Sequence, residues 1–428
     1  MVRITRIPLL WLLLSSGPSW CGAPAQDAGA EIPMREKTFI ASKVYASLQM
    51  YFAHWRAIPD VDLDAAYRPY LAEALASDSR LSFDLATMKF LAVFRNGHTI
   101  FVDSWLEQGP GKPLPFRLLF VDGKWVVKTS RLPDLPPGTI IDRLDATDIE
   151  TFFHEKQVYI PASNEREARS NLCFRPFLFP LRFSLTTAGG ARVEVDRTQA
   201  AADPPADPAK KSRPSSSGRW QEEPATAYVK IPSFGAAEYQ DTAIEFLKQF
   251  SAAKTLIIDV RGNGGGSTPT RLIGALMDRP YAGWHEMTNL HIPLERIRGL
   301  PEKQISWSSP MTKPSSPLFG GRLVIVADRD CASACEDFVM PFKHNRRATV
   351  VGETTGGSSG QPYLCNLGNG MAFTIGAKRE YFPDGAGFEG VGIEPDVRAE
   401  WSVEVLKKGA DPMMEKALEI AAGRVKLE

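Results

Sequence analysis

The part of the chain from residue 224 to residue 402 alternates short apolar segments with longer amphipathic ones. The apolar segments, which we expect to be strands, are residues 228–231, 255–260, 323–327 and 349–351. The amphipathic segments, which we expect to be helices, are residues 237–250, 270–277 and 333–344. Because strands that alternate with helices pack in layers around a common core, this stretch predicts a layered α/β domain.

Residues 36–105 predict an N-terminal helical region. Apolar side chains recur there at helical spacing, beginning with Ile40, Val44, Leu48 and Phe52. We expect a third helix of this region to begin near Ser82 and to end at Asn96-Gly97, a pair that suits a helix terminator.

The remaining parts of the chain differ from both regions in their composition. Residues 106–198 predict a β-rich domain, since strand patterns flank Asp122-Gly123, a dipeptide that favours two-residue hairpin turns. Residues 199–223 are rich in Pro, Ala and Ser and predict a linker. Residues 403–428 predict a C-terminal helix or tail.

Residues 1–25 have the pattern of a secretory signal peptide. A charged start, a short apolar run and a small-residue exit follow one another. The run is too short to span a bilayer, and no later segment is long and apolar enough to do so. We therefore expect removal of this leader and a periplasmic or secreted protein. A lipid anchor at Cys21 is not favoured, because Ser19-Trp20 matches a lipobox poorly.

The charge balance excludes some classes of partner. The chain has 428 residues with 50 basic and 50 acidic side chains, so nothing in its composition indicates a nucleic-acid binder. No Cys-x-x-Cys and no cluster of histidines is present, so we expect neither a metal nor a cofactor. In an oxidising compartment Cys331, Cys335 and Cys365 could supply one disulfide, and buried free thiols are the alternative.

Residues 323–336 carry the strongest indication of chemistry. A buried strand runs into a turn, and the expected helix begins at Ser333. A serine there lies at the positive end of a helix, and its small neighbours Ala332 and Ala334 leave room for a substrate carbonyl. The arrangement would supply a nucleophile and one oxyanion donor, the backbone N–H of Ala334. The competing interpretation is a serine that only caps the helix.

Residues 257–266 form a strand that leads into a glycine-rich loop. No Gly-Lys-Ser/Thr closes this loop, so it is not a phosphate-binding P-loop, and its glycine spacing does not fit a dinucleotide fingerprint. An oxyanion hole needs two donors, and Gly264 or Gly265 could supply the second. A plain tight turn is the competing interpretation.

Four motifs follow one another along the C-terminal half. They are Asp259-Val260-Arg261-Gly262-Asn263-Gly264-Gly265-Gly266, Ala332-Ser333-Ala334-Cys335-Glu336, Val351-Gly352-Glu353-Thr354-Thr355-Gly356-Gly357 and Gly390-Val391-Gly392-Ile393-Glu394-Pro395-Asp396. In this order they resemble the carboxyl-terminal-processing (tail-specific) protease family, which includes the tricorn core protease. The resemblance covers essentially the whole mature chain. It implies a mixed α+β multidomain protein with a crotonase-like layered α/β peptidase core, an N-terminal helical region and a PDZ-like domain, the last indicated by residues 136–145.

The resemblance implies that Ser333 is the nucleophile, but it also exposes a departure. Where the tail-specific branch has a lysine as general base, this chain has Ser358, and a serine hydroxyl cannot take over that role. The tricorn-like branch uses a histidine and a glutamate instead.

The tricorn-like pattern implies that His98 is the base and that Glu389 orients it. Asn96-Gly97-His98-Thr99 matches the place of the histidine, and counting back from Gly392 gives the glutamate. Glu394 is the competing acid. Gly97 stands where the tricorn branch has a further serine.

Two functions follow from these residues. The first is an exported serine peptidase that cleaves peptides or unfolded chain ends, with a PDZ-like domain that binds a peptide terminus by strand addition. The second is an inactive family member that binds a ligand or peptide, as the family's retinoid-binding members do, and the missing lysine leaves it open. A thioester enzyme is a more distant third, since the core resembles the crotonase fold.

Overall fold

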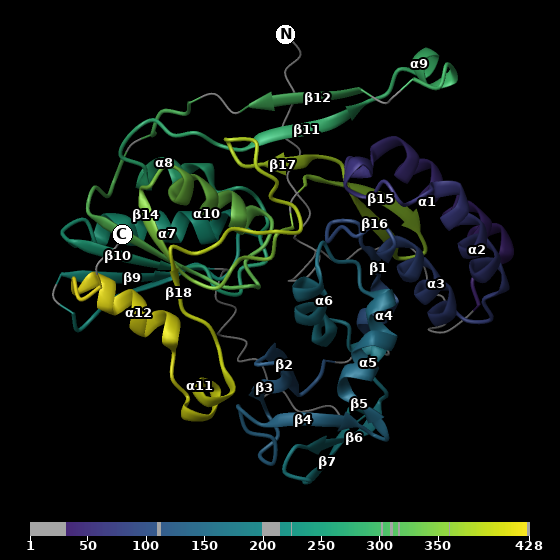
Figure 1. Cartoon of the computed structure of the whole chain (residues 1–428), viewed down its shortest axis with the longest axis horizontal. Coiled ribbons are helices and arrows are strands. Elements are labelled where there is room, and N and C mark those ends of the chain that lie inside the picture. The colour runs from purple at the N-terminus through teal and green to yellow at the C-terminus, as the bar shows by residue number, and fades with distance from the viewer. Residues whose placement is uncertain are drawn as a thin grey trace.

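The computed structural model describes residues 31–425, except residues 109–112, 199–214, 224, 301–302, 309–310, 316 and 359. The described residues form a mixed α/β structure in which helices and several sheets share the chain (Figure 1). The leader expected at residues 1–25 lies outside them. Every helix within the described ranges is too short or too polar to cross a bilayer.

A six-stranded sheet forms the centre of the C-terminal half. Its spatial order is β18 (Val397–Arg398), β14 (Ala348–Gly352), β13 (Arg322–Ala327), β10 (Thr255–Asp259), β9 (Thr226–Lys230) and β8 (Ser217–Trp220). All neighbouring strands run parallel except β8 and β9.

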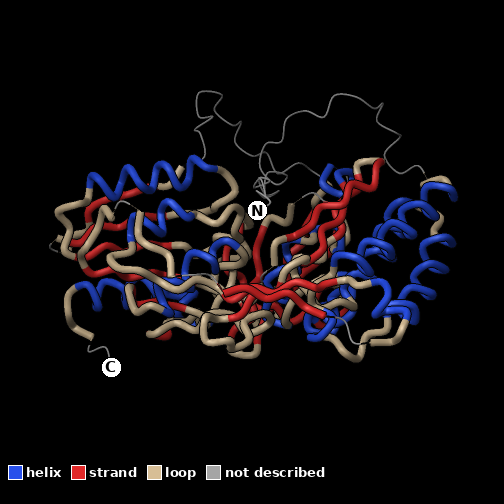
Figure 2. The backbone as a smooth tube through the Cα atoms, turned by 90° about the horizontal axis from the view of Figure 1, so that it is seen from above, coloured by secondary structure: helices blue, strands red, loops and turns tan. Residues whose placement is uncertain are grey.

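Helices cover both faces of this sheet (Figure 2). They are α7 (Ala237–Gln249), α8 (Thr270–Leu276) and α10 (Ala334–His344) on one face, and α12 (Pro412–Ala421) on the other. Since successive side chains of a strand point to opposite faces, Leu256 and Ile258 pack toward α7, α8 and α10, whereas Ile257 packs toward α12. The layered α/β core predicted from the alternation is thus confirmed.

A second sheet of antiparallel strands occupies the middle of the chain. Its order is β2 (Phe116–Val121), β3 (Lys124–Ser130), β4 (Ile140–Leu144), β6 (Arg182–Thr187) and β7 (Arg192–Asp196), with β5 (Thr147–Asp148) paired to β4. Helices α5 (Ile149–Lys156) and α6 (Glu165–Asn171) and the 3₁₀ turns η2 (Gln157–Tyr159), η3 (Leu172–Phe174) and η4 (Pro176–Leu178) complete this part. Asp122 and Gly123 join β2 to β3 with φ of 52° and 69°, the backbone that the predicted hairpin turn requires.

The N-terminal region folds as helices, as predicted. They are α1 (Met34–Tyr51), η1 (Trp55–Ala57), α2 (Leu63–Ala76), α3 (Arg80–Ala92) and α4 (Ser104–Gln108). Helix α3 begins earlier than predicted, because the hydroxyl of Ser79 accepts the Ser82 N–H and caps it. It also ends earlier, and Arg95 rather than Gly97 takes the left-handed backbone, with φ of 47°.

The core of the helical region is completed by residues from the far end of the chain. Strand β1 (Phe101–Asp103) pairs with β16 (Met371–Gly376), which pairs with β15 (Pro362–Gly368). Phe373 and Ile375 are buried against α1 and α3 in one apolar cluster. The chain therefore returns from the C-terminal half to the helices, and the two lie beside each other (Figure 1).

The prediction of a linker over residues 199–223 is wrong for the last part of that range. Residues 217–220 form the edge strand β8, because Gly218 lies directly on the aromatic rings of α7, where an added Cβ would be 2.5 Å from Phe246. Residues 199–214 lie outside the described ranges. The segment after α8 forms an arm of β11 (His285–Leu290), α9 (Pro293–Ile297) and β12 (Lys303–Ser308), paired with β17 (Arg379–Tyr381). The described C-terminal segment forms α11 (Val403–Lys408) and then α12.

Candidate active site

Ser333 lies at the junction between the turn after β13 and helix α10. Its backbone adopts φ of 55°, a left-handed conformation that a side chain other than glycine rarely takes. Its N–H donates to the carbonyl of Ser358 at 3.0 Å and to the Glu336 carboxylate at 3.3 Å. These bonds fix the strained residue at the positive end of an eleven-residue helix.

The glycine loop after β10 packs against Ser333. A Cβ added to Gly265, which has φ of 100°, would lie 2.8 Å from Ser333 Cβ and 2.9 Å from the Ala334 backbone nitrogen. Only a glycine allows this approach of the two backbones. The Gly265 N–H donates to Asn263 Oδ1 at 2.9 Å, so this donor is already engaged. Ala334 is the first helical residue, and its N–H has no acceptor within α10.

A disulfide encloses the serine. Cys331 and Cys335 are bonded to each other, with their Cα atoms 5.5 Å apart, and both side chains are fully buried. Cys365 is a buried free thiol in the N-terminal core. Of the two interpretations of these cysteines, the disulfide therefore holds for the pair that brackets Ser333.

His98 follows the N-terminal helices and is buried next to the same loop. Its Nδ1 lies 3.1 Å from the Ser358 hydroxyl, and its backbone N–H donates to Asn96 Oδ1 at 3.2 Å. Burial lowers the pKa of His98 from 6.5 to about 4, although the nearby charge of Glu389 raises it. The imidazole is therefore neutral at physiological pH and able to accept a proton.

Ser358 connects the two predicted catalytic residues. Its carbonyl accepts the Ser333 N–H, and its hydroxyl binds the His98 ring. Because Nδ1 of His98 is bonded to Ser358, Nε2 is the nitrogen left to face a nucleophile. The position at which the tail-specific branch has a lysine thus belongs to the site in this chain as well.

Glu389 lies in the same network but reaches His98 through other side chains. Its Oε1 accepts from Asn96 Nδ2 at 2.8 Å and from the Ser163 hydroxyl at 2.6 Å. The Ser163 hydroxyl lies 3.4 Å from that of Ser358, which in turn holds His98. The competing acid, Glu394, forms an exposed ion pair with Arg398 at 3.1 Å.

The carboxyl groups of Glu336, which is buried, and Glu167, which is partly buried, support these loops. Glu336 accepts from the backbone N–H groups of Gly357 and Ser358 at 2.8 and 3.1 Å, and burial raises its pKa well above the ordinary value. Glu167 accepts the Ser163 N–H at 2.6 Å, and burial raises its pKa to about 7. Both carboxyl groups therefore lie close to Ser358.

The contacts that Ser163, Asn96 and Glu167 make in the site were not predicted from the sequence. Ser163 and Glu167 come from the middle part of the chain, and Ser163 lies 195 positions before Ser358. A local signal was available, since Asn164 caps α6 and Glu167 follows at the spacing of a capping box. That signal indicates only a helix start, so it does not predict a contact with Glu389.

A layered α/β core with a strained serine at a helix start, a glycine loop beside it and a neutral histidine close by contains the components that a serine-type hydrolase requires. The model of peptidase family S41 matches residues 225–399 of this chain.

Individual curated proteins are also similar to part of this chain. A tricorn protease homologue of Streptomyces coelicolor is 27% identical over 196 residues, which cover 45% of this chain and 15% of that protein. The carboxyl-terminal-processing protease of Synechocystis is 26% identical over 206 residues, which cover 47% of this chain and 45% of that protein. The matched segment thus spans less than half of the length of these two relatives.

The fold also matches a solved structure. Mature CPAF superposes with a TM-score of 0.67 at 13% sequence identity, covering 91% of this chain and 97% of that one. The likeness therefore extends beyond the matched family segment to the helical and middle parts of the chain, and it concerns the fold.

Proposed function

We propose that this protein is an exported serine-type peptidase that hydrolyses peptide bonds in peptides or unfolded chain ends. Ser333 is the nucleophile, His98 the general base, and Glu389 the carboxylate that stabilises the protonated histidine. The observation that carries the proposal is the position of Ser358, which binds the Ser333 backbone and the His98 ring at the same time. One residue thereby sets the nucleophile and the base relative to each other.

In the acylation step, Ser333 Oγ attacks the substrate carbonyl and its proton passes to Nε2 of His98. The tetrahedral intermediate carries its negative charge on the former carbonyl oxygen, next to the Ala334 N–H. We assign the second donor to Gly264, because the Gly265 N–H is engaged by Asn263. The C–N bond then breaks, and His98 returns the proton to the leaving amine.

In the deacylation step, water replaces the amine. His98 takes a proton from the water, the hydroxide attacks the acyl-enzyme, and the proton returns to Ser333 Oγ as the acid product leaves. Glu389 acts in both steps by favouring the charged imidazole, which agrees with its effect of raising the pKa of His98. No cofactor takes part in this scheme.

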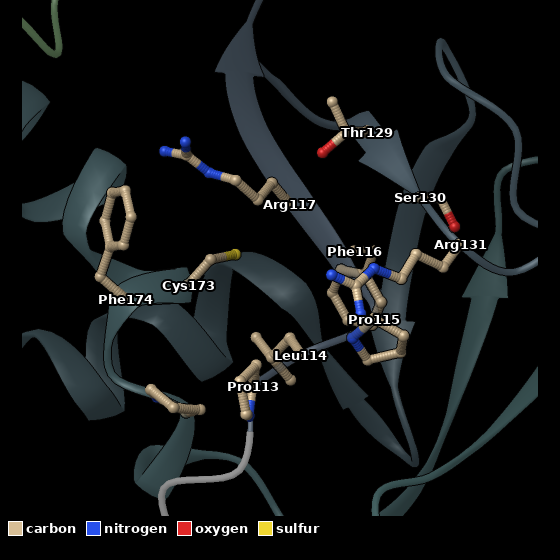
Figure 3. A pocket seen from close by; sticks show the side chains of 11 residues that line it. Pro113, Leu114, Pro115, Phe116, Arg117, Thr129, Ser130, Arg131, Cys173 and Phe174 are labelled. Carbon is tan, nitrogen blue, oxygen red and sulfur yellow. The ribbon is translucent and has the colours of Figure 1, made fainter. Parts of the chain in front are cut away.

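The substrate class is supported by a pocket in the middle part of the chain, which we interpret as the PDZ-like domain (Figure 3). The pocket has a volume of about 490 Å³ and lies at the start of β2, the edge strand of its sheet. The Leu118 N–H on this edge meets only the weak acceptor Cys173 Sγ, at 3.4 Å. An extended peptide can add to such an edge as a further strand.

The same pocket is connected to the catalytic turn. Arg117 lies with its guanidinium 4.2 Å from the Phe174 ring in the pocket, and it reaches Asp330 at 3.5 Å. Asp330 belongs to the turn that ends at Ser333. A peptide bound at β2 would therefore lie next to the turn that carries the nucleophile.

Labelling with a fluorophosphonate probe tests the catalytic assignment, since the probe forms a bond to an activated serine and releases fluoride. We expect the native chain to be labelled and Ser333→Ala to remain unlabelled. His98→Ala should slow labelling by about 100-fold or more. His344→Ala is the matched control, because His344 is an exposed histidine at the far end of α10. A folded native protein that is not labelled, or His98→Ala labelled at the native rate, would contradict a peptidase and favour a ligand-binding relative.

Cleavage of an unfolded protein tests the pocket. Phe174→Ala should raise KM for a long unfolded substrate several-fold and leave the labelling rate unchanged. Leu181→Ala is the control, since both side chains are exposed apolar groups of the middle part. Equal KM values for the two variants would exclude the pocket from substrate binding.

Sequencing of the N-terminus tests export. We expect the protein recovered from the periplasm or medium to begin at Pro24 or Gln26, after the small-residue exit of the leader. An intact leader on a protein retained in the cytoplasm would contradict this part of the proposal.

A further inference from the structure

The segment from Ser163 to Glu167, at the start of α6, reaches out of the middle part of the chain into the candidate active site. It binds two loops of the C-terminal half at once. Asn164 Nδ2 donates to the carbonyls of Gly356 and Gly390, at 2.8 and 3.2 Å. The first carbonyl belongs to the loop that carries Ser358, and the second follows Glu389 directly.

Arg166 repeats this connection. Its Nη2 donates to the carbonyls of Thr355 and Val391, at 2.7 and 3.1 Å. The side chains of Asn164 and Arg166 therefore bridge the two loops. Both residues lie at the start of α6, outside the C-terminal half of the chain. Such bonds fix the distance between the Ser358 loop and the Glu389 loop.

Ser163 lies at the centre of this contact. Its hydroxyl donates to Glu389 Oε1 at 2.6 Å and accepts the Gly97 N–H at 2.9 Å. Gly97 directly precedes His98, so Ser163 joins the histidine segment to the acid. Glu167 holds Ser163 in turn, by accepting its backbone N–H at 2.6 Å.

The space around Gly97 shows that this arrangement needs the absence of a side chain there. A Cβ on Gly97 would lie 2.2 Å from Glu167 Oε1 and 2.5 Å from Ser358 Oγ. Both polar atoms therefore occupy the volume in which a side chain beside His98 would otherwise sit. The hydroxyl that binds the residue before His98 is that of Ser163, which comes from another part of the chain.

We propose that Ser163 and Glu167 are positioning residues of the active site: Ser163 fixes the Glu389 carboxylate relative to His98, and Glu167 fixes Ser163. This inference rests on the proposed function, because it assigns His98 and Glu389 their catalytic roles. It adds that the middle part of the chain supplies part of the active site, in addition to any peptide it binds.

The rate of fluorophosphonate labelling of Ser333 tests the proposal without a known substrate. It is measured on the full mature chain from about pH 2 to about pH 9, so that the range begins about two pH units below the His98 pKa of about 4. Ser163→Ala should label about 10-fold to 100-fold more slowly, since the base loses part of its support. The acid limb of the pH profile, where the labelling rate falls as the pH drops, should also move to lower pH in this variant. The reason is that Glu389 raises the pKa of His98, and a displaced carboxylate raises that pKa less. A purely structural role would lower the folded fraction without moving this limb.

Glu167→Gln supplies an independent variant that keeps the shape of the side chain. We expect it to slow labelling in the same direction as Ser163→Ala. Glu165→Gln is the matched control, since Glu165 is an exposed glutamate of the same helix turn and binds Arg169 at 2.6 Å. Ser163→Thr, which retains a hydroxyl, should recover part of the rate.

The outcomes separate this inference from the proposed function. If Ser333→Ala and His98→Ala abolish labelling while Ser163→Ala and Glu167→Gln behave like Glu165→Gln in rate and pH profile, the positioning role is wrong and the peptidase assignment stands. If Ser333→Ala is still labelled at the native rate, the proposed function fails and this inference fails with it.

Discussion

The hydroxyl of Ser358 lies 3.1 Å from Nδ1 of His98, at the position where a related branch of the family carries its catalytic lysine. A serine cannot act as the base there, but it can hold the base that we propose for this chain, His98. The same residue accepts the Ser333 N–H through its carbonyl at 3.0 Å. The residue at the position of that lysine therefore contacts both His98 and Ser333 in this chain.

Ser358→Ala should slow the labelling of Ser333 by about 10-fold to 100-fold, because the His98 ring loses the partner that orients it. The carbonyl that binds Ser333 remains, so the fold of the nucleophile turn should be retained. Labelling kinetics together with the circular dichroism spectrum check this prediction. An unchanged rate would show that the His98 ring is oriented by other contacts.

The dependence of the reaction on pH should reflect the buried histidine. Because burial lowers the pKa of His98 to about 4, the neutral imidazole persists well below pH 6.5, and the labelling rate should fall only as the pH drops through about 4. Glu389→Gln should move this limb to still lower pH, since the lost carboxylate raises the pKa whereas His54 and Lys378 lower it. Circular dichroism over the same range separates protonation from acid unfolding. A limb near pH 6.5 would contradict the buried, neutral histidine.

Two glycines of the loop after β10 should respond differently to alanine. Gly265→Ala should reduce the labelling rate by about 100-fold or more, because its Cβ would lie 2.8 Å from Ser333 Cβ and displace the oxyanion site. Gly262→Ala is the control. The φ of 72° at this position strains an alanine, but the added Cβ meets no atom of the described residues within 4 Å. It should cost about 1–2 kcal/mol of stability and keep its activity. Equal activities of the two variants would contradict the close packing on Ser333.

The disulfide that brackets the nucleophile should contribute to stability and to reactivity. Replacing both Cys331 and Cys335 by alanine should lower the free energy of unfolding by about 2 kcal/mol, the loop-closure value for so short a ring. Labelling of Ser333 should slow as well, since the strained turn loses a covalent restraint. Urea unfolding and labelling rates check both effects, with Cys173→Ala, a free thiol, as the control. If the double variant matched the control in both, the disulfide would be dispensable to the site.

Much of the core and the strand, turn and helix around Ser333 could be predicted because their signals are local. The strand before Ser333, the turn and the helix after it follow one another directly, so apolar periodicity and small neighbours predict where the serine lies. The glycine loop is similarly readable, since a run of glycines indicates close backbone approach. His98 and Glu389 required the resemblance to a family, because neither residue type nor spacing singles them out.

Some boundaries were decided by contacts that the local pattern does not contain. Residues 217–220 lie in a segment whose composition predicts a linker, yet they form β8, because the rings of α7 cover Gly218. Residues 362–376 read as part of the peptidase core, but β16 completes the apolar cluster of the N-terminal helices. Burial against a distant element overrides local preference in both cases.

By itself, the sequence determined the layered core, the nucleophile turn and the glycine loop, since a periodic pattern dictates local conformation and the face that is buried. The tertiary structure alone decided how the proposed base, His98, and the proposed acid, Glu389, are connected. Ser163 and Glu389 are 226 positions apart and lie in parts of the chain with separate cores, so their hydrogen bond depends on how those cores pack. Hydrogen bonds between distant loops leave no period in the sequence, which is why the support of His98 became visible only in the folded chain.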